Sequence, residues 1–368
     1  MSKSEKINHL QINNYKSIRR MDLDCNRINV FIGEPNVGKS NILEALSLYH
    51  LSSLLSKNQN LETTKSLTVD IKDLFRVRKA DNLFHFNDIS KEISIIANGL
   101  PWNVFLSCQN TVNNQLNWGG VDIAKTTQEK VFVWGNKDGI HIPTVFDNDF
   151  NSLNDNFYSG YVLPYRYKND IEFHDKLNFL DGLMPPYGNN LANVIRLNYP
   201  LQVFLGELLK DRGIEIHLHE ETGNITILSK RTEGLAVELP YKAMSDTFKR
   251  MLFYIAAIKH PDRYMDIITL EEPEVHSFPS YVSYLGDEII DSPKQFFIVT
   301  HSPYLLNNLI ENTPKEELAV FVCGYDDKDF QTIAKRLSQE DLSELIDYGI
   351  DIFLNLSKYL NDRVEHRP

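Results

Sequence analysis

One segment, GEPNVGKS at residues 33–40, constrains the fold of this chain more than any other feature. It follows the apolar run RINVFI, which predicts a buried strand over 27–33, and precedes apolar residues at helical spacing over 40–55. The pattern G-x-x-x-x-G-K-[ST] between a strand and a helix is typical of a loop whose backbone amides surround phosphate groups at a helix N-terminus. By residue frequencies alone, it arises in roughly one or two of a hundred chains of this length.

The residue types in this loop predict how it would hold phosphate. Lys39 would reach the β and γ phosphates, and the hydroxyl of Ser40 would coordinate Mg²⁺. The candidate binding residues of the loop and of the helix that follows are Gly33, Glu34, Pro35, Asn36, Val37, Gly38, Lys39, Ser40 and Asn41.

A pair of glutamates ends a second apolar run. In IITLEEPEVHSFP, residues 267–279, Glu271 and Glu272 stand at the carboxyl end of a predicted strand, where open α/β sheets bind ligands. Neighbouring strand residues point to opposite faces, so the two carboxylates should differ in role. One would hold Mg²⁺ through water, and the other would polarise the attacking water. The alternative, a solvated acidic turn, would be preferred if no phosphate loop were present.

A third apolar run, QFFIV, is followed by Thr300, His301 and Ser302. A histidine at this position can hydrogen-bond a γ phosphate or the attacking water. The alternative is a histidine with a purely structural partner at a strand end. The order of the three motifs along the chain favours function.

Composition excludes several classes of protein. Of 368 residues, 38 are Lys or Arg and 50 are Asp or Glu, which gives a net charge of −12 and argues against coating by nucleic acid, though not against a local basic surface. The three cysteines, Cys25, Cys108 and Cys323, are too few and too scattered for a disulfide framework. The sequence has no signal peptide and no apolar run of ~18 residues, so we expect a cytoplasmic protein without a membrane segment.

Strand-like and helix-like segments alternate at both ends of the chain, which predicts an α/β domain with a largely parallel sheet. Residues 7–18 predict one half-buried strand, 191–212 a helix broken at Pro200, 245–258 a helix, and 338–360 a helical C-terminus. A hairpin is expected around 222–224. Further strands are expected at 67–71, 93–97, 102–106, 131–134, 160–164, 265–270, 296–300 and 318–323.

Taken together, the three motifs resemble the ATP-binding-cassette (ABC) type of P-loop ATPase, and more closely the ATPase heads of the overcoming-lysogenization-defect (OLD) nucleases, RecF and SMC proteins. The opening INNYKSI at 12–18 and the segment EEPEVHSFP at 271–279 are similar to those of that group. The resemblance implies an ABC-type P-loop NTPase fold with a mixed, largely parallel central sheet, an antiparallel β lobe and a helical lobe. It implies ATP and Mg²⁺ as cofactors, Glu271 as the magnesium-side carboxylate, Glu272 as catalytic base and His301 as switch histidine.

The resemblance also implies a signature helix that caps the γ phosphate bound by a partner subunit. Ser245 and Asp246 fit its start, but Thr247 replaces the usual glycine. Lys249 and Arg250 could compensate with charge. The alternative is that Ser245 is only a helix N-cap.

Other correspondences are looser. Lys16 and Arg19 resemble basic residues that touch nucleotide, and the alternative for each is a solvated surface charge. The glutamine loop of the family has two candidate positions, Gln109 and the region around Arg166.

The implied organisation is one ABC-type ATPase head over 1–368. Residues 56–190 would form a variable inserted lobe, and 191–368 would carry the signature helix, the acidic strand, the switch-histidine strand and C-terminal helices. OLD nucleases end in a TOPRIM domain, but only 368 − 301 = 67 residues follow His301. We therefore expect a stand-alone head.

These features predict an ATPase that dimerises around ATP and controls a separately encoded effector, such as a nuclease, in bacterial anti-phage defence. One alternative is a DNA repair or chromosome-associated ATPase that contacts DNA through the modest basic clusters at 75–82 and 229–234. Another is a nucleotide-gated scaffold with little turnover, which Thr247 favours. A transporter subunit fits the acidic strand poorly. Any contact with nucleic acid is expected to go through the partner.

Overall fold

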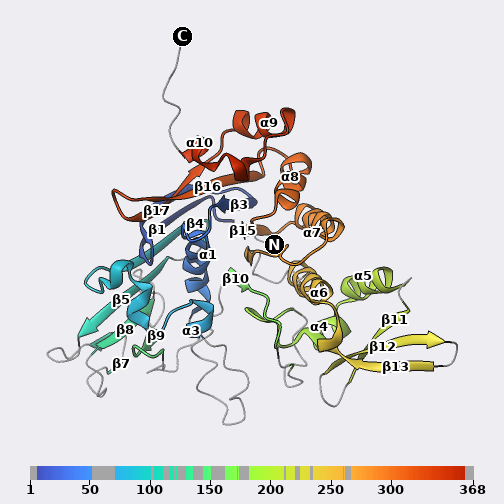
Figure 1. Cartoon of the computed structure of the whole chain (residues 1–368). Helices are drawn as coiled ribbons and strands as arrows, with labels where there is room; N and C mark the ends of the chain where they lie inside the picture. The colour runs from blue at the N-terminus through green and yellow to red at the C-terminus, as the bar shows by residue number, and fades with distance from the viewer. Residues whose placement is uncertain are drawn as a thin grey trace. The chain divides into compact units, whose positions relative to one another are not determined.

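The computed structural model describes most of the chain (Figure 1). The described residues are 6–51, 71–100, 103–110, 117–118, 121–122, 130–135, 144–150, 162–171, 173, 182–210, 213–219, 224–232, 235–259, 261 and 267–360. They form two compact units, each discontinuous in sequence. The first unit is Met1–Pro164, Tyr264–Glu271 and Lys294–Pro368; the second is Tyr165–Arg263 and Glu272–Pro293.

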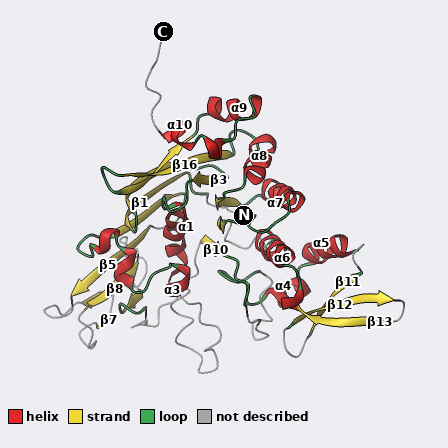
Figure 2. Ribbon diagram, in the orientation of Figure 1, coloured by secondary structure: helices red, strands yellow, loops and turns green. Residues whose placement is uncertain are grey.

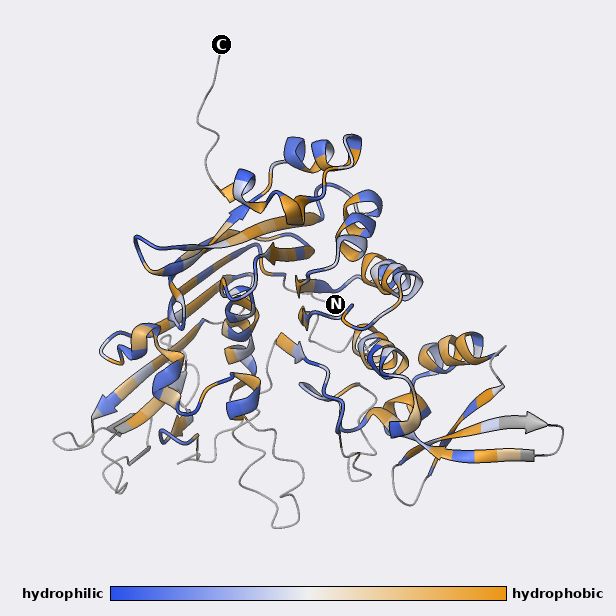
Figure 3. Ribbon diagram, in the orientation of Figure 1, coloured by the Kyte–Doolittle hydropathy of each residue, from blue (hydrophilic) through white to orange (hydrophobic). Residues whose placement is uncertain are grey.

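The core of the first unit is a six-stranded sheet in the order β10-β14-β15-β3-β16-β17. Strands β14, β15, β3 and β16 are mutually parallel, and β17 is antiparallel to β16. Hydrophobic residues fill the four parallel strands (Figure 3), and β3 and β15 are buried along their whole length, as apolar runs without alternation predict. The predicted α/β fold with a mixed, largely parallel sheet is confirmed. The bounds are β3 Ile28–Gly33, β10 Val162–Tyr165, β14 Ile267–Glu271, β15 Gln295–Val299, β16 Leu318–Asp326 and β17 Gln331–Arg336.

A second sheet of this unit is antiparallel, in the order β2-β1-β4-β5-β8-β9. The prediction of one strand over 7–18 is wrong, because the chain turns at Lys16 and Ser17 and pairs Tyr15 with Ile18. Strands from within 56–190 extend this N-terminal hairpin through β4, the neighbour of β1. The bounds are β1 His9–Tyr15, β2 Ile18–Asp24, β4 Ile93–Asn98, β5 Val104–Asn110, β8 Lys130–Gly135 and β9 Thr144–Phe146, beside a small pair of β6 Asn117–Trp118 and β7 Val121–Asp122.

The helices of the first unit differ from expectation at one place, Ile71. The helix after the phosphate loop, α1, spans Lys39–Ser47 and continues as a 3-10 turn, η1, at Leu48–His50; residues 52–70, which include most of the predicted strand 67–71, lie outside the described residues, and Ile71 begins a helix. The predicted helical C-terminus over 338–360 is confirmed as a series of short helices: Gly349 (φ 59°) ends α9, Asp351 caps a 3-10 turn, and α10 follows. The bounds are α3 Ile71–Leu74, η2 Ala80–Leu83, η3 His85–Asn87, α8 Pro303–Asn312, α9 Gln339–Asp347, η7 Ile352–Leu354 and α10 Leu356–Leu360.

The second unit combines helices with a three-stranded antiparallel sheet, β11-β12-β13 (Figure 2). The predicted break at Pro200 is confirmed: Asn198 caps a new helix, and Pro200 occupies its first turn, where no backbone donor is needed. The predicted hairpin is β11 with β12, and β13 is an additional strand. The bounds are α4 Leu191–Leu197, α5 Tyr199–Leu209, β11 Ile214–Leu218, β12 Ile225–Thr232, β13 Leu235–Pro240, η6 Tyr241–Ala243, α6 Asp246–Ile258 and α7 Pro279–Asp291.

No helix in the described ranges is both long enough and apolar enough to cross a bilayer.

Candidate nucleotide-binding site

The predicted phosphate loop connects β3 to α1 through a backbone that glycine makes possible. Gly38, the residue before α1, has φ 92°, and a Cβ at this position would lie 2.1 Å from the Thr332 hydroxyl oxygen. At Gly33, a Cβ would lie 2.4 Å from the carbonyl oxygen of Cys323 on β16. Both glycines therefore allow the loop to pack against neighbouring strands more closely than any side chain permits.

Lys39 is buried at the base of the loop, with 5% of its surface exposed. Its ammonium group donates hydrogen bonds to the carbonyl oxygens of Gly33 (2.9 Å) and Glu34 (2.6 Å). Glu34, Pro35 and Asn36 form the exposed crest of the loop. The lysine charge is thus held inside the loop at the N-terminus of α1, where the helix dipole also favours an anion.

A small hydrogen-bonded cluster of Thr332, Ser17 and Asn41 supports the phosphate loop. The Thr332 hydroxyl of β17 donates to the carbonyl of Val37 (2.8 Å) and lies 2.5 Å from the Ser17 hydroxyl, which also accepts from the Asn41 amide (2.6 Å). The turn between β1 and β2 and the edge strand β17 thereby fix the loop's conformation. Sequence reasoning missed Ser17 and Thr332, and it did not anticipate the contact between Asn41 and Ser17.

The strand ends bring two further predicted residues to the same edge of the core sheet. Glu271 pairs in register with Val299, and Val299 with Phe31, two residues before the phosphate loop begins. His301 follows β15, the direct neighbour of β3, and is exposed. Since α1 also contacts β14 and β15, Ser40 in its first turn belongs to this edge as well.

Four charged side chains form a continuous network beside the loop. Lys16 forms an ion pair with Glu44 of α1, and it also donates to the Phe75 carbonyl. Arg76 lies 3.7 Å from the other oxygen of Glu44 and pairs with the carboxylate of Glu271. The network connects the β1–β2 turn, α1 and the acidic end of β14.

Burial governs the titration of the inner part of this network. The pKa of Glu44 is raised, mainly because burial disfavours its charged form, although Lys16 and Arg76 oppose the shift. Burial likewise lowers the pKa of Lys16 against the opposing effect of Glu44, and it raises the pKa of Tyr15, whose hydroxyl lies 3.4 Å from Glu44. Each charge is therefore buried at a cost that the other offsets, and removing either Lys16 or Glu44 would leave the remaining charge without its ion-pair partner.

The network shows which of the basic residues Arg76, Lys16 and Arg19 are solvated surface charges. In the segment 75–82, Arg76 is engaged with carboxylates and is not a solvated loop charge. Lys16 has only 13% of its side chain exposed, which contradicts the solvated alternative. Arg19 is 66% exposed and lies 3.8 Å from Asp329, so for this residue the surface alternative fits.

Glu272 leaves the strand rather than continuing it. β14 ends at Glu271, and Glu272 adopts φ 43° and accepts a backbone hydrogen bond from Val275. This tight turn therefore sets the direction of the Glu272 side chain. Because side chains alternate along a strand, Glu271 and Glu272 were expected to point to opposite faces, but Glu272 lies beyond the strand. Both remain the candidate metal-side and catalytic carboxylates.

The predicted signature residues lie in the second unit, at the start of α6. Ser245 is exposed, and its side chain accepts a hydrogen bond from the amide of Phe248 (3.3 Å), as an N-cap does. Thr247 donates its hydroxyl to the His276 carbonyl. Lys249 is buried and donates to Asn169 (2.5 Å).

Arg250 also has internal partners. It pairs with Asp246 (3.1 Å) and stacks over the Tyr167 ring at 4.5 Å. The two cations that could compensate for Thr247 thus have partners within this unit.

The two candidates for the glutamine loop lie in different surroundings. Gln109 is on β5 of the antiparallel sheet and lies 3.4 Å from the Ser107 hydroxyl. Arg166 follows β10, the strand beside β14 in the core sheet.

Two family models match the chain. One, described as an AAA ATPase domain, matches residues 6–158; the other, described as an AAA domain, putative AbiEii toxin, Type IV TA system, matches 136–307. No curated protein matches significantly.

Solved structures of SMC heads are similar over nearly the whole chain. An Smc head bound to the C-winged helix domain of ScpA is 15% identical, covering 91% of this chain and 99% of that one, with a TM-score of 0.47. An Smc head with an extended coiled coil bound to the C-terminal domain of ScpA, derived from Pyrococcus furiosus, is 14% identical over 93% and 99%, with a TM-score of 0.47. The SMC head domain from Thermotoga maritima is 12% identical over 90% and 99%, with a TM-score of 0.39.

The family matches cover both halves of the site. The first includes the phosphate loop, and the second includes the acidic strand end and His301. The chain is therefore similar to AAA-type ATPase domains over all three motifs that the parallel sheet carries.

Proposed function

We propose that this protein binds ATP with Mg²⁺ and hydrolyses ATP at the edge of the core sheet. The observation that carries the proposal is the buried Lys39 ammonium inside the loop between β3 and α1, with Glu271 and His301 at the ends of the neighbouring parallel strands. Loops of this kind bind the phosphates of nucleoside triphosphates through backbone amides and the lysine.

Each residue has a defined part in this proposal. Lys39 binds the β and γ phosphates, and Glu272 orients and deprotonates the attacking water, with His301 beside the γ phosphate. Ser40 and Glu271 would hold Mg²⁺, which prefers such oxygen ligands and would neutralise phosphate charge. The donor set fits the ion, since a hydroxyl and a carboxylate are both oxygen ligands; at Glu271 the ion would displace the guanidinium of Arg76.

We also propose that two copies dimerise around ATP, with Ser245 of one copy facing the phosphates bound by the other. Its support is the exposed position of Ser245 at the N-terminus of the long helix α6. The dimer would control a separately encoded effector, such as a nuclease, in cytoplasmic anti-phage defence. That step rests on the resemblance to OLD-type ATPases alone.

Turnover tests the proposed chemistry. Wild type should hydrolyse ATP, and Glu272→Gln should bind it but lose hydrolysis by about 100-fold or more, because the general base is lost. The matched control is Glu340→Gln, an exposed glutamate in the first turn of α9, which should leave turnover unchanged. Equal turnover in Glu272→Gln and wild type would refute the role of Glu272.

Size-exclusion chromatography tests dimerisation. Glu272→Gln should elute as a dimer with ATP and as a monomer without it, since the nucleotide is held but not consumed. Adding Ser245→Arg should abolish the dimer. A monomer in ATP would contradict the proposal.

The second candidate is a nucleotide-gated scaffold with little turnover. It is favoured by Thr247, whose hydroxyl is bound to the His276 carbonyl where the family has a glycine. ATP binding without hydrolysis in wild type would support it. Salt-sensitive, saturable binding of duplex DNA by the isolated chain would instead favour the DNA-contacting alternative.

A further inference from the structure

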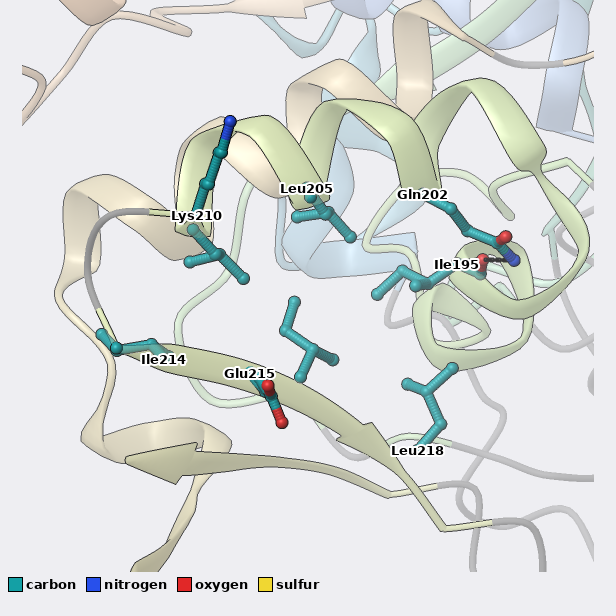
Figure 4. Close-up of a pocket in the computed structure, with 11 residues that line it drawn as sticks. Ile195, Gln202, Leu205, Lys210, Ile214, Glu215 and Leu218 are labelled. Atoms are coloured by element: carbon teal, nitrogen blue, oxygen red, sulfur yellow. Dashed lines mark hydrogen bonds between the residues drawn. The ribbon is translucent and has the colours of Figure 1, made fainter. Parts of the chain in front are cut away.

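The three-stranded sheet of the second unit has two chemically different faces. Along β11, the alternate residues Ile214, Ile216 and Leu218 line an apolar groove of about 630 Å³ beside α5 (Figure 4). Because side chains alternate along a strand, His217 points to the opposite face, and His219, immediately beyond the strand, continues that series. This second face is polar and carries no part of the ATPase site described above.

Two strands contribute to a cluster on this polar face. His219 Nε2 lies 2.7 Å from Oε1 of Glu238, a residue of β13, and His217 Nδ1 lies 3.9 Å from the same oxygen. One ligand atom from each of these residues lies within 4.8 Å of the others. The imidazole rings of the two histidines are 4.6 Å apart, centroid to centroid. Among the described residues, His217, His219 and Glu238 are the group of three His, Cys, Asp or Glu side chains whose ligand atoms lie this close together.

A central strand helps to orient the carboxylate. Thr226 of β12 stands opposite His217 in the sheet, and its hydroxyl donates to Oε1 of Glu238 (2.7 Å) while lying 3.0 Å from His219 Nε2. Hydrogen bonds of this kind to a ligating group are characteristic of metal sites, where they fix the direction of the ligand. The cluster therefore has a supporting partner as well as three ligand atoms.

We propose that His217, His219 and Glu238 bind a zinc-class divalent ion on the outer face of this sheet. Two imidazoles and one carboxylate match the ligand preference of Zn²⁺, whereas Mg²⁺ prefers oxygen ligands throughout. Bonds of about 2.0–2.2 Å to a tetrahedral ion place ligand atoms roughly 3.3 Å apart, within the range of separations seen here. Water completes the coordination, because all three side chains are partly exposed.

Such an ion would join strands that do not pair directly. β12 lies between β11 and β13, so His217 and His219 come from one edge of the sheet and Glu238 from the other. A bound ion would connect these edges across the central strand. Binding to the folded state alone then stabilises the sheet by mass action.

Isothermal titration of the untagged full-length protein with Zn²⁺, in buffer containing Mg²⁺ and no nucleotide, tests the site. One ion should bind per chain, and His219→Ala and Glu238→Gln should each weaken that binding by at least about tenfold. The control is His9→Ala, since His9 also lies near two carboxylates, those of Asp22 and Asp24, yet forms no three-ligand cluster. Retained affinity in both cluster variants would overturn the proposal, as would non-saturable uptake by wild type.

Thermal unfolding gives an independent readout. Zn²⁺ should raise the melting temperature of wild type and of His9→Ala but not that of His219→Ala or Glu238→Gln. Circular dichroism of the variants without metal establishes that they are folded. An equal rise in all four proteins would contradict a site at this cluster.

Discussion

The guanidinium of Arg76 donates to the carboxylate of Glu271, the last residue of the acidic strand β14. Arg76 follows the short helix α3, has φ 47°, and also lies near Glu44 of the helix that starts at the phosphate loop. A positive charge is thus held at the carboxylate that would face Mg²⁺ in the proposed ATPase. Any ion binding there must compete with a resident ion pair.

This competition predicts the effect of Arg76→Met on metal dependence. Without the guanidinium, Mg²⁺ no longer competes for Glu271, so half-maximal ATP turnover should need about three- to tenfold less Mg²⁺. That change corresponds to about 1 kcal/mol, the usual strength of a partly exposed ion pair. A Mg²⁺ titration of turnover at saturating ATP measures it.

The control for Arg76 is Arg78→Met, an exposed arginine two residues further along. It should leave the Mg²⁺ requirement unchanged. If Arg76→Met raises the requirement, or abolishes turnover at saturating Mg²⁺, the arginine supports catalysis directly and the competition argument is wrong.

The buried pair of Lys16 and Glu44 predicts a large effect on stability. Lys16→Met leaves a buried carboxylate whose nearest remaining cation is Arg76, 3.7 Å away, and should lower the free energy of unfolding by about 3 kcal/mol. The double variant Lys16→Met, Glu44→Leu removes both charges and should recover much of this loss. Urea unfolding of both proteins gives the comparison, and a double variant less stable than the single one would contradict it.

Local sequence was sufficient for the parts of the site that depend on one strand and its next few residues. The apolar runs before Gly33, Glu271 and Thr300 predicted β3, β14 and β15, because parallel strands buried on both faces are continuously hydrophobic. Since such strands end at a common edge, the order of the motifs also indicated that their residues belong together.

The parts that sequence missed depend on partners distant in the chain. β17, with the sequence QTIAKR, lacks an apolar run, and its strand conformation comes from pairing with β16. Thr332 acts on the phosphate loop across 295 residues, and Arg76 acts on Glu271 across 195. No local pattern encodes such contacts. The turn at Lys16 likewise needs a positive φ at a residue other than glycine, which sequence rarely signals.

Thr332 is expected to act on nucleotide affinity without touching phosphate. Thr332→Val removes the hydroxyl that donates to Val37 and contacts Ser17, so the loop should lose part of its fixed conformation. One hydrogen bond of about 1 kcal/mol predicts a roughly fivefold weaker binding of ATP. Fluorescence titration with a labelled ATP analogue measures this, and Thr313→Val, a buried threonine after α8, serves as the control. Equal losses in both variants would show a general destabilisation instead.

Asp246, next to the signature serine, should make the second unit sensitive to acid. Burial raises the pKa of Asp246, but hydrogen bonds from Arg250 and Tyr167 outweigh it and hold the pKa below 3.8, its ordinary value. Because this pKa is lower in the folded protein than in the unfolded chain, the charged carboxylate stabilises the fold at any pH above the ordinary value. This stabilisation is lost as the pH falls through the folded-state pKa. At neutral pH, Asp246→Asn should therefore cost about 1 kcal/mol.

The difference between wild type and Asp246→Asn should shrink towards zero as the pH is lowered from neutrality to below 3.8. Urea unfolding at several pH values, followed by circular dichroism, measures the difference, while Asp291→Asn, an exposed aspartate at the end of α7, should change stability little throughout. A difference for Asp246→Asn that stays constant with pH would mean that its hydrogen bonds, rather than its charge, stabilise the start of α6.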